Sequence, residues 1–289
     1  MLYYLIINYQ SIPLIKDLLK HFFQLPSAAY QVVIVNNFSP DQKTLNTFKT
    51  DRIHIIEAGE NLGFGRACNV GLSWIYKQNP QALIWLLNPD TFCDPQMIAE
   101  AEAFFKTHPE ISILGTLIYT TDHTIWFAGG SFNPKTGGII SENLLPMNAQ
   151  SDYRVCDWVS GCSLIINLRQ FQDCPQFDAN YFLYYEDFDF CQRYQQQGHL
   201  IAMTAQISIT HQVSAVTNRN LRQKFYHSTY SYLLTLEKYT NSLIFYVRLM
   251  RLLIYSLILF PFRRAIALGK ITGTWHYFQH KFLACSPLS

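Results

Sequence analysis

An unusual cluster of acidic and aromatic residues occupies positions 184–190, which read YYEDFDF. A helix start explains part of this cluster, because Asp187 suits an N-cap and Asp189 suits the first turn. Asp189 can also pair with Arg193, four residues further on. Neither effect requires Glu186 or the surrounding rings. The cluster therefore also predicts a partly desolvated carboxylate that could accept a proton from a substrate.

A second candidate site is a carboxylate that directly follows a buried strand. Asn88, Pro89 and Asp90 come after the apolar run ALIWLL. Pro89 restricts the backbone, so Asp90 should leave the strand end in a defined direction. Asp90 could hold Mg²⁺ or Mn²⁺ with phosphate oxygens and water, although these residue types are also ordinary in turns. His211, after the strand pattern ISIT, becomes a metal ligand only if the fold brings it to Asp90.

Two further segments combine amides and glycines after apolar runs. Asn36 and Asn37 follow the run QVVIV, and the segment NLGFGRACN covers residues 61–69. Such residues can hydrogen-bond a base, a ribose or a diphosphate, but they also form tight turns and helix starts. The pair Gly63 and Gly65 lacks the third glycine of a dinucleotide fingerprint, which argues against an NAD(P)-dependent oxidoreductase.

These residues need a scaffold that gathers the ends of several strands. Continuous apolar runs predict strands buried on both faces, and hence a mostly parallel sheet flanked by helices. Ligands in such α/β sheets bind beyond the carboxyl ends of the strands. The expected strands are residues 3–7, 31–35, 53–56 and 82–87, and the expected helices between and after them include residues 66–78 and 94–107.

The pattern changes after residue 110. Residues 111–150 contain two Gly-Gly pairs and short apolar runs, which predict hairpins and loops. Residues 158–167 and 200–210 read as further strands, and residues 187–197 as a helix closed by Gly198. We therefore expect one α/β domain that extends to about residue 240.

Composition narrows the classes of function. The chain has 289 residues, of which 49% are hydrophobic and 15% charged, and its formal net charge is +2. This charge provides no general basic field for nucleic acid, and the low charged fraction suggests that some surface meets an apolar partner. The seven cysteines show no zinc-binding spacing, and the N-terminus reads as a strand and not as a signal peptide. We expect a cytoplasmic protein.

The C-terminal part contains a long apolar stretch at residues 243–262. Arg248 and Arg251 interrupt it, and Arg263 and Arg264 follow it. A central charge is costly in a membrane-spanning helix, so a helix lying in a membrane interface fits better. A helix packed on the domain is the alternative.

In this order, the segments resemble family 2 glycosyltransferases of the GT-A fold, and most closely their bacterial rhamnosyltransferase-like branch. The resemblance covers about residues 1–240. Its motifs are IINYQ, VVIVNNFS, NLGFGRACNVG, IWLLNPDTF, WVSGCSLIINLRQF and FDANYFLYYEDFDFCQRYQQQG. It implies a GT-A domain at residues 1–240, with a Rossmann-like, mostly parallel central sheet flanked by helices. Residues 241–289 would form a helical apolar and basic tail that associates with a membrane.

The resemblance also implies roles for individual residues. Asp187 would be the catalytic base and Glu186 would contact the acceptor. Asp90 would bind Mg²⁺ or Mn²⁺ at the donor diphosphate, with His211 as a further ligand. The implied donor-binding residues are Asn8, Asn36, Asn61, Gly63, Asn69, Asn88 and Asp90. The implied sugar and acceptor pocket contains Trp158, Gly161 and Glu186.

The implied reaction is an inverting, metal-dependent hexosyl transfer. The donor would be dTDP-rhamnose or, alternatively, a UDP-hexose such as UDP-galactose or UDP-glucose. The acceptor would be a growing polysaccharide or a polyprenyl-linked oligosaccharide at the inner face of the cytoplasmic membrane. Two positions depart from the family pattern, since Asn36 stands where Asp is common and the metal motif keeps only one carboxylate. These departures leave a non-catalytic nucleotide-sugar-binding protein as a further alternative.

Overall fold

The computed structural model describes all residues except 23–29, 41, 95, 144–150, 213–219 and 286–289. The chain divides into two compact units. The first unit comprises Met1–Ser131, Ile140–Asn180 and Glu186–Val213. The second comprises Phe132–Ile139, Tyr181–Tyr185 and Ser214–Ser289. Every site residue predicted from the sequence lies in the first unit.

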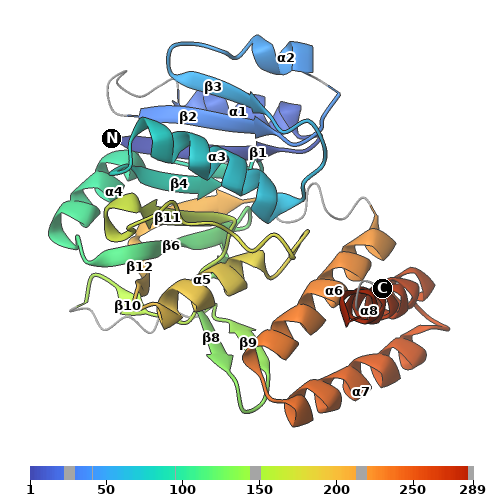
Figure 1. The fold of residues 1–289 in the computed structure, drawn as a ribbon. Coiled ribbons are helices and arrows are strands. Elements are labelled where there is room, and N and C mark those ends of the chain that lie inside the picture. The colour runs from blue at the N-terminus through green and yellow to red at the C-terminus, as the bar shows by residue number, and fades with distance from the viewer. Residues whose placement is uncertain (23–29, 41, 95, 144–150, 213–219, 286–289) are drawn as a thin grey trace. The chain divides into compact units, whose positions relative to one another are not determined.

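The first unit is built on one large sheet. Within the described residues, ten strands form this sheet in the order β10-β12-β6-β11-β4-β1-β2-β3, with β5 beside β12 and β7 beside β6 (Figure 1). The strands are β1 (Leu2–Asn8), β2 (Tyr30–Asn36), β3 (Ile53–Glu57), β4 (Leu83–Leu87), β5 (Thr91–Cys93), β6 (Ile111–Thr120), β7 (Ile125–Phe127), β10 (Arg154–Val155), β11 (Ser163–Asn167) and β12 (Leu200–His211). Strands β8 (Gly130–Asn133) and β9 (Gly138–Ser141) form a separate pair.

Strand direction divides the sheet into a parallel half and a mixed half. Strand β1 pairs in parallel with β2 and β4, and β2 pairs in parallel with β3. Strand β11 is antiparallel to both β4 and β6, whereas β12 is again parallel to β6. The predicted α/β fold with a mostly parallel sheet is therefore confirmed.

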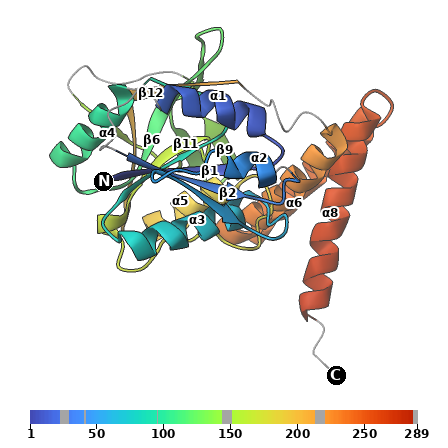
Figure 2. The ribbon, with the colours of Figure 1, turned by 90° about the horizontal axis from the view of Figure 1, so that it is seen from above.

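Helices cover both faces of the sheet. They are α1 (Ile12–Phe22), α2 (Gln42–Asn46), α3 (Phe64–Gln78), α4 (Gln96–Thr107) and α5 (Glu186–Gln196), with a 3₁₀ turn at Leu168–Gln170. Figure 2 shows α1 on one face of the sheet and α3 and α5 on the other. Because α5 starts at Glu186, Asp187 lies in its first turn and is not the N-cap that the sequence suggested.

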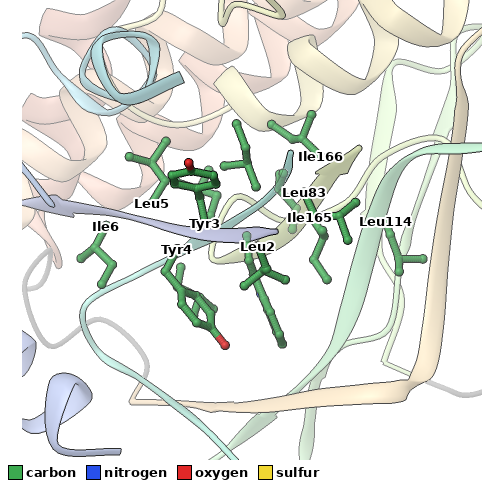
Figure 3. Close-up of a cluster of buried hydrophobic side chains, with 14 of the residues drawn as sticks. Leu2, Tyr3, Tyr4, Leu5, Ile6, Leu83, Leu114, Ile165 and Ile166 are labelled. Carbon is green, nitrogen blue, oxygen red and sulfur yellow. The ribbon is translucent and has the colours of Figure 1, made fainter. Parts of the chain in front are cut away.

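The core of the first unit lies between these layers. Strand β1 is buried along its whole length, and Figure 3 shows its side chains beside those of β4, β6 and β11. The Tyr4 ring stacks on Phe22 of α1 with ring centroids 4.2 Å apart. The Trp85 indole donates a hydrogen bond of 2.9 Å to Ser163 Oγ, so the polar atom of this buried ring is satisfied. This packing fixes the strands whose ends carry the predicted site residues.

The second unit is mainly helical. It contains α6 (Leu221–Tyr239), α7 (Ser242–Leu259) and α8 (Arg264–Cys285). Its small core consists of Leu233, Leu236, Phe245, Leu249 and Tyr277. Helix α6 groups with α7 and α8, so this unit begins before residue 240, the domain boundary expected from the sequence. A functional boundary at that residue stays a prediction.

Candidate active site

Helix α5 carries two neighbouring carboxylates with different surroundings. Asp187 is half-buried, and both of its oxygens accept backbone hydrogen bonds. Gly161 N–H donates to Oδ2 at 2.8 Å, and Phe188 N–H donates to Oδ1 at 2.8 Å. Burial raises the pKa of Asp187 and these two hydrogen bonds oppose the rise. Asp187 is therefore oriented firmly, and each oxygen keeps a lone pair for another donor.

Glu186 is buried, with only 6% of its surface exposed. Its Oε2 has no hydrogen-bond partner among the described residues. Burial, together with the negative charge of Asp187, raises the pKa of Glu186 to about 8. A Cβ on Gly65, in the first turn of α3, would lie 3.4 Å from the Glu186 Cβ. Glu186 therefore faces the protein interior near α3, and at neutral pH the protonated form predominates.

The residues around these carboxylates fall into two groups. Phe188 and Phe190 are buried in the first unit, where the Phe190 ring stacks on Phe177 at 4.3 Å between centroids. Tyr184 and Tyr185 have left-handed backbones, with φ of 70° and 65°. Non-glycine residues adopt this region at a cost of order 1 kcal/mol or more each, and such strain is common beside functional groups. The aromatic residues of the 184–190 cluster thus belong partly to the core and partly to a strained turn before α5.

Strand pairing brings Asp90 and His211 together. His211 is the last residue of β12, and its register partner on β5 is Thr91, the residue after Asp90. Both side chains are buried, and His211 Nε2 lies 3.2 Å from Asp90 Oδ1. Gln212 N–H also donates to the Asp90 carbonyl at 2.9 Å. We expected His211 to be a metal ligand only if the fold brought it close to Asp90, and the structure meets this condition.

The chemistry of this pair fits a divalent cation that shares its ligands with a donor molecule. Asp90 Oδ1 is buried and faces His211 Nε2 without forming a hydrogen bond to it, and His211 Nδ1 is buried without a hydrogen-bond partner in the described part of the chain. Buried polar atoms without partners are rare in proteins and suggest an absent ion or ligand. No group of three or more His, Cys, Asp or Glu side chains that could hold a metal occurs among the described residues. Further ligands would have to come from phosphate and water.

The strand ends on the other side of the site are joined by hydrogen bonds. Asn8 Nδ2 donates to Asn36 Oδ1 at 2.9 Å, linking the ends of β1 and β2. Asn36 Nδ2 donates in turn to Glu57 Oε2 at 2.8 Å, which adds the end of β3. The buried residues Asn8 and Asn36, both predicted to bind the donor, thus form one network with the exposed Glu57.

A neighbouring network shapes the turn before α3. Asn37 accepts from Leu62 N–H at 2.8 Å and donates to Asn61 Oδ1 and the Gly63 carbonyl. Gly63 has a φ of 78°, so a side chain there would be strained. Asn61 and Gly63 therefore lie together in the turn before α3, and a donor-binding role for them stays a prediction.

The remaining predicted residues are also held by backbone contacts. Asn69 exchanges two hydrogen bonds with the backbone of Phe177, and its amide is therefore engaged within the protein. Asn88 N–H donates to the Cys162 carbonyl at 3.0 Å. Gly161 positions Asp187 directly, because its N–H is one of the two donors to that carboxylate. The donor and acceptor roles of these residues stay predictions.

Trp158 is held by a close backbone contact. It forms a bridge with Gly130, and a Cβ on Gly130 would lie 2.1 Å from Trp158 Nε1. This buried Nε1 has no hydrogen-bond partner in the described residues. The Trp158 ring lies 6.3 Å from Phe188 and 5.0 Å from Phe127, between ring centroids. Trp158 is thus packed between Gly130 and two aromatic rings, and its role in a sugar pocket stays a prediction.

Trp126 and Glu57 were not predicted from the sequence, and Asn37 was noted there only together with Asn36. Trp126 packs edge-on against His211, with ring centroids 5.0 Å apart. Asn37 and Glu57 belong to the strand-end networks. A signal existed for Glu57, because it is the last residue of the IHIIE strand. No local pattern distinguishes Trp126, whose position depends on the pairing of β6 with β7.

Comparisons with known proteins agree with this geometry. A sequence model of the glycosyl transferase family 2 matches residues 4–160, more than half of the chain. The "low-salt glycan biosynthesis hexosyltransferase Agl10" of Haloferax volcanii is 24% identical over 228 residues, which are 78% of this chain and 70% of that protein. An "N-acetylglucosaminyl-diphospho-decaprenol L-rhamnosyltransferase" of Mycobacterium tuberculosis is 25% identical over 193 residues, 58% of this chain. The chain spans only 61% of that mycobacterial relative.

The fold is also similar to solved structures. A crystal structure of GalNAc-T7 with UDP, GalNAc and Mn²⁺ superimposes with a TM-score of 0.62 at 11% sequence identity. The match covers 82% of this chain and 47% of that protein. At this identity the likeness shows the GT-A fold and nothing more about substrates.

Proposed function

Because the chain belongs to glycosyl transferase family 2, we propose that it transfers a hexose from a nucleotide-diphosphate donor to an acceptor hydroxyl with inversion. The observation that carries the proposal is the placement of Asp187. Its carboxylate is held by Gly161 N–H and Phe188 N–H and keeps a lone pair on each oxygen. In the same unit, Asp90 and His211 offer buried ligand atoms for a metal–diphosphate group.

Asp187 is the proposed base. The acceptor hydroxyl donates its proton to Asp187 as its oxygen attacks the anomeric carbon of the donor. The bond from that carbon to the diphosphate oxygen breaks, and the electron pair leaves with the nucleoside diphosphate. A single displacement of this kind inverts the configuration without a covalent enzyme intermediate. A carboxylate is a sufficient base because the hydroxyl becomes acidic as it attacks.

Asp90 and His211 are the residues that would hold Mg²⁺ or Mn²⁺. When bound, such an ion neutralises charge on the diphosphate and makes it a better leaving group. Burial of both side chains limits their motion and keeps bulk water from their ligand atoms. The GalNAc-T7 structure, which has the same fold and contains UDP and Mn²⁺, supports the use of a divalent ion.

Rhamnose from dTDP-rhamnose is the favoured donor sugar, and a polyprenyl-linked saccharide the favoured acceptor. Support comes from the similarity to the mycobacterial rhamnosyltransferase, whose name specifies a diphospho-decaprenol acceptor. A UDP-hexose transferase is the main alternative, supported by the similarity to a hexosyltransferase. A nucleotide-sugar-binding protein without activity is the least favoured reading, since it leaves the oriented Asp187 without a purpose.

The decisive experiment compares the wild type with Asp187→Asn. A panel of dTDP- and UDP-sugars with Mn²⁺ or Mg²⁺ is offered with a polyprenyl-diphosphate-linked acceptor, and saccharide product is measured. Loss of the base should lower the transfer rate by about 10²-fold or more while nucleotide binding persists. Equal rates for the two proteins would overturn the base assignment. An inactive wild type that binds nucleotide-sugars would favour the binding protein.

Helix α7 is the proposed contact with the inner face of the cytoplasmic membrane. By length and composition it is the one described helix that could cross a membrane, with a mean hydropathy of 1.8 and 17% of its residues buried. It carries Arg248 and Arg251, which suits an interfacial helix better than a spanning one. Its exposed apolar side chains are Leu243, Tyr246, Val247, Met250, Ile254, Tyr255, Leu257 and Ile258. The size of this apolar face exceeds what isolated surface residues explain.

A charge placed on this face tests the membrane proposal. The double variant Met250→Asp and Leu257→Asp should cosediment less with vesicles that contain anionic lipid than the wild type does. Ile140→Asp is a matched control, because Ile140 is a similarly exposed apolar residue on β9. Equal cosedimentation of the wild type and the double variant would rule out α7 as the contact.

A further inference from the structure

Glu57 is a carboxylate at the end of a strand whose neighbours end in neutral amides. It is the last residue of β3, which lies at the edge of the sheet beside β2. In the parallel register its partner on β2 is Asn36. The corresponding strand ends of β1 and β2 carry the neutral amides Asn8 and Asn36. Glu57 is exposed, and it alone brings a carboxylate to these three neighbouring ends.

Asn36 itself has no hydrogen-bonding capacity left for a ligand. Its Oδ1 accepts from Asn8 Nδ2 at 2.9 Å and from Ser39 N–H at 3.2 Å. Its Nδ2 donates to Glu57 Oε2 at 2.8 Å and to the Ser39 carbonyl at 3.3 Å. The amide orientation is settled because a carboxylate and a carbonyl can only accept and a backbone N–H can only donate. Both amide protons and both lone pairs of Asn36 are thus used.

The same network leaves one oxygen of Glu57 available. Oε2 is fixed by the Asn36 amide, which restrains the Glu57 side chain at the strand end. Oε1 accepts no hydrogen bond within the described residues, and the side chain reaches solvent. Asn36 therefore acts as a support that aims a single carboxylate oxygen outward. A single charged acceptor suits a ligand edge with one N–H donor.

Glu57 and the segment that carries Asp90 both follow the carboxyl ends of parallel strands in the same sheet. Strands β4, β1, β2 and β3 are consecutive neighbours in the sheet. Three strand spacings separate the end of β4, which precedes Asp90, from the end of β3, a distance of roughly 14 Å. An extended nucleoside diphosphate has a comparable span between its β-phosphate and its base. A donor that reaches from Asp90 across the ends of β4, β1 and β2 would place its base beside Glu57.

From these contacts we propose that Glu57 Oε1 accepts a hydrogen bond from the N3–H of a uracil or thymine base in the donor nucleotide. This proposal rests on the proposed function, because it needs a nucleotide donor at the strand ends. Uracil and thymine present one N–H between two carbonyls, which matches one free carboxylate oxygen. Guanine presents two adjacent N–H groups, and a carboxylate accepts their hydrogen bonds best with both of its oxygens. Glu57 has only one oxygen free, because Oε2 is bonded to Asn36. Cytosine has an acceptor at N3 and would be repelled.

Binding of base analogues to two Glu57 variants tests this assignment. The dissociation constants of UDP, dTDP, CDP, GDP and N3-methyl-UDP are measured by calorimetry with Mn²⁺. The wild type should prefer UDP or dTDP over CDP and N3-methyl-UDP by about tenfold or more, the value of a charged hydrogen bond. Glu57→Ala should lose this preference while it binds N3-methyl-UDP as the wild type does. Glu57→Gln keeps an acceptor for Asn36 and should show an intermediate preference.

Glu60→Ala is the matched control, because Glu60 is an exposed carboxylate three residues further on that lies 3.7 Å from Arg66. It should keep the full preference for UDP. Glu57→Ala with an unchanged preference, or a wild type that prefers GDP, would overturn the role of Glu57 and leave the transferase proposal intact. A wild type that binds none of the nucleotides would overturn the proposed function as well.

Discussion

The two halves of the strand-end surface differ in how their buried polar atoms are satisfied. At the ends of β1 and β2, Asn8 and Asn36 form a closed network with Glu57. At the ends of β4 and β12, Asp90 and His211 meet but keep unpartnered buried atoms. The first half is complete within the described residues, whereas the second half is incomplete.

This difference indicates that the half with Asn8 and Asn36 is structural and that the half with Asp90 and His211 binds a ligand. An unsatisfied buried polar atom costs about 1–3 kcal/mol of stability. A protein that retains such an atom is expected to use it in binding. A bound ion or substrate can supply the missing partners of Asp90 and His211. The amides of the other half have no such need, and they hold the backbone and the one exposed carboxylate in place. Substitutions in the two halves should therefore affect different quantities.

The largest effect is expected in the incomplete half. Asp90→Asn should lower the transfer rate by about 10²-fold or more, because metal neutralisation of a leaving group contributes several kcal/mol. It should also abolish the rise in melting temperature that Mn²⁺ adds to that given by UDP alone. The melting temperature without ligand should change little, because Asn removes a buried charge and still places an oxygen or a nitrogen next to His211 Nε2.

Asp94→Asn is the matched control for this prediction. Asp94 is an exposed carboxylate four residues further on that accepts from Gln96 N–H, and Asn can replace it in that contact. An Asp90→Asn protein that kept its Mn²⁺-dependent stabilisation would remove Asp90 from the metal site.

The sequence indicated the incomplete half better than the complete one. Asp90, His211, Glu186 and Asp187 are residue types whose chemistry draws attention at strand ends and helix starts. Their convergence could not be predicted locally, because the pairing of β5 with β12 joins positions more than a hundred residues apart. The parallel strands were predictable from continuous apolar runs. The antiparallel β11, inserted between β4 and β6, required the tertiary structure.

Substitutions in the complete half should lower the stability of the fold. Asn37→Ala removes hydrogen bonds to Leu62 N–H, Asn61 and the Gly63 carbonyl. The free energy of unfolding should fall by about 2 kcal/mol, because the turn loses the partners of its buried polar groups. Urea denaturation measures the change. Asn46→Ala, at an exposed position on α2, should stay within about 0.5 kcal/mol of the wild type.

Asn37→Ala also tests whether the two halves act independently. Its Mn²⁺-dependent stabilisation should persist, because Asp90 and His211 are untouched. Loss of that stabilisation at unchanged stability would show that the two halves do not act separately. The sequence placed Asn37 beside Asn36 without separating their roles, since only the contacts show that one holds the α3 turn and the other holds Glu57.

Glu186, on α5, also has a buried oxygen without a partner in the described residues, and its effect on stability should depend on pH. Its pKa is raised from 4.5 to about 8 by burial and by Asp187, so the folded state keeps a proton that the unfolded state loses. Stability from this group is present below pH 4.5 and is lost as pH rises toward 8. The contribution changes by about 1.4 kcal/mol per pH unit at most. Wild type should therefore lose stability relative to Glu186→Gln as pH rises from 5 to 8.

Urea denaturation of both proteins at several pH values measures this difference directly, because most other titrating groups cancel between them. Glu100→Gln, at an exposed position on α4, should follow the wild type at every pH. Parallel curves for wild type and Glu186→Gln would mean that Glu186 ionises in the folded state as it does in the unfolded chain. The buried Oε2 would then have a partner in solution, and Glu186 would belong with the satisfied scaffold and not with the proton-handling site.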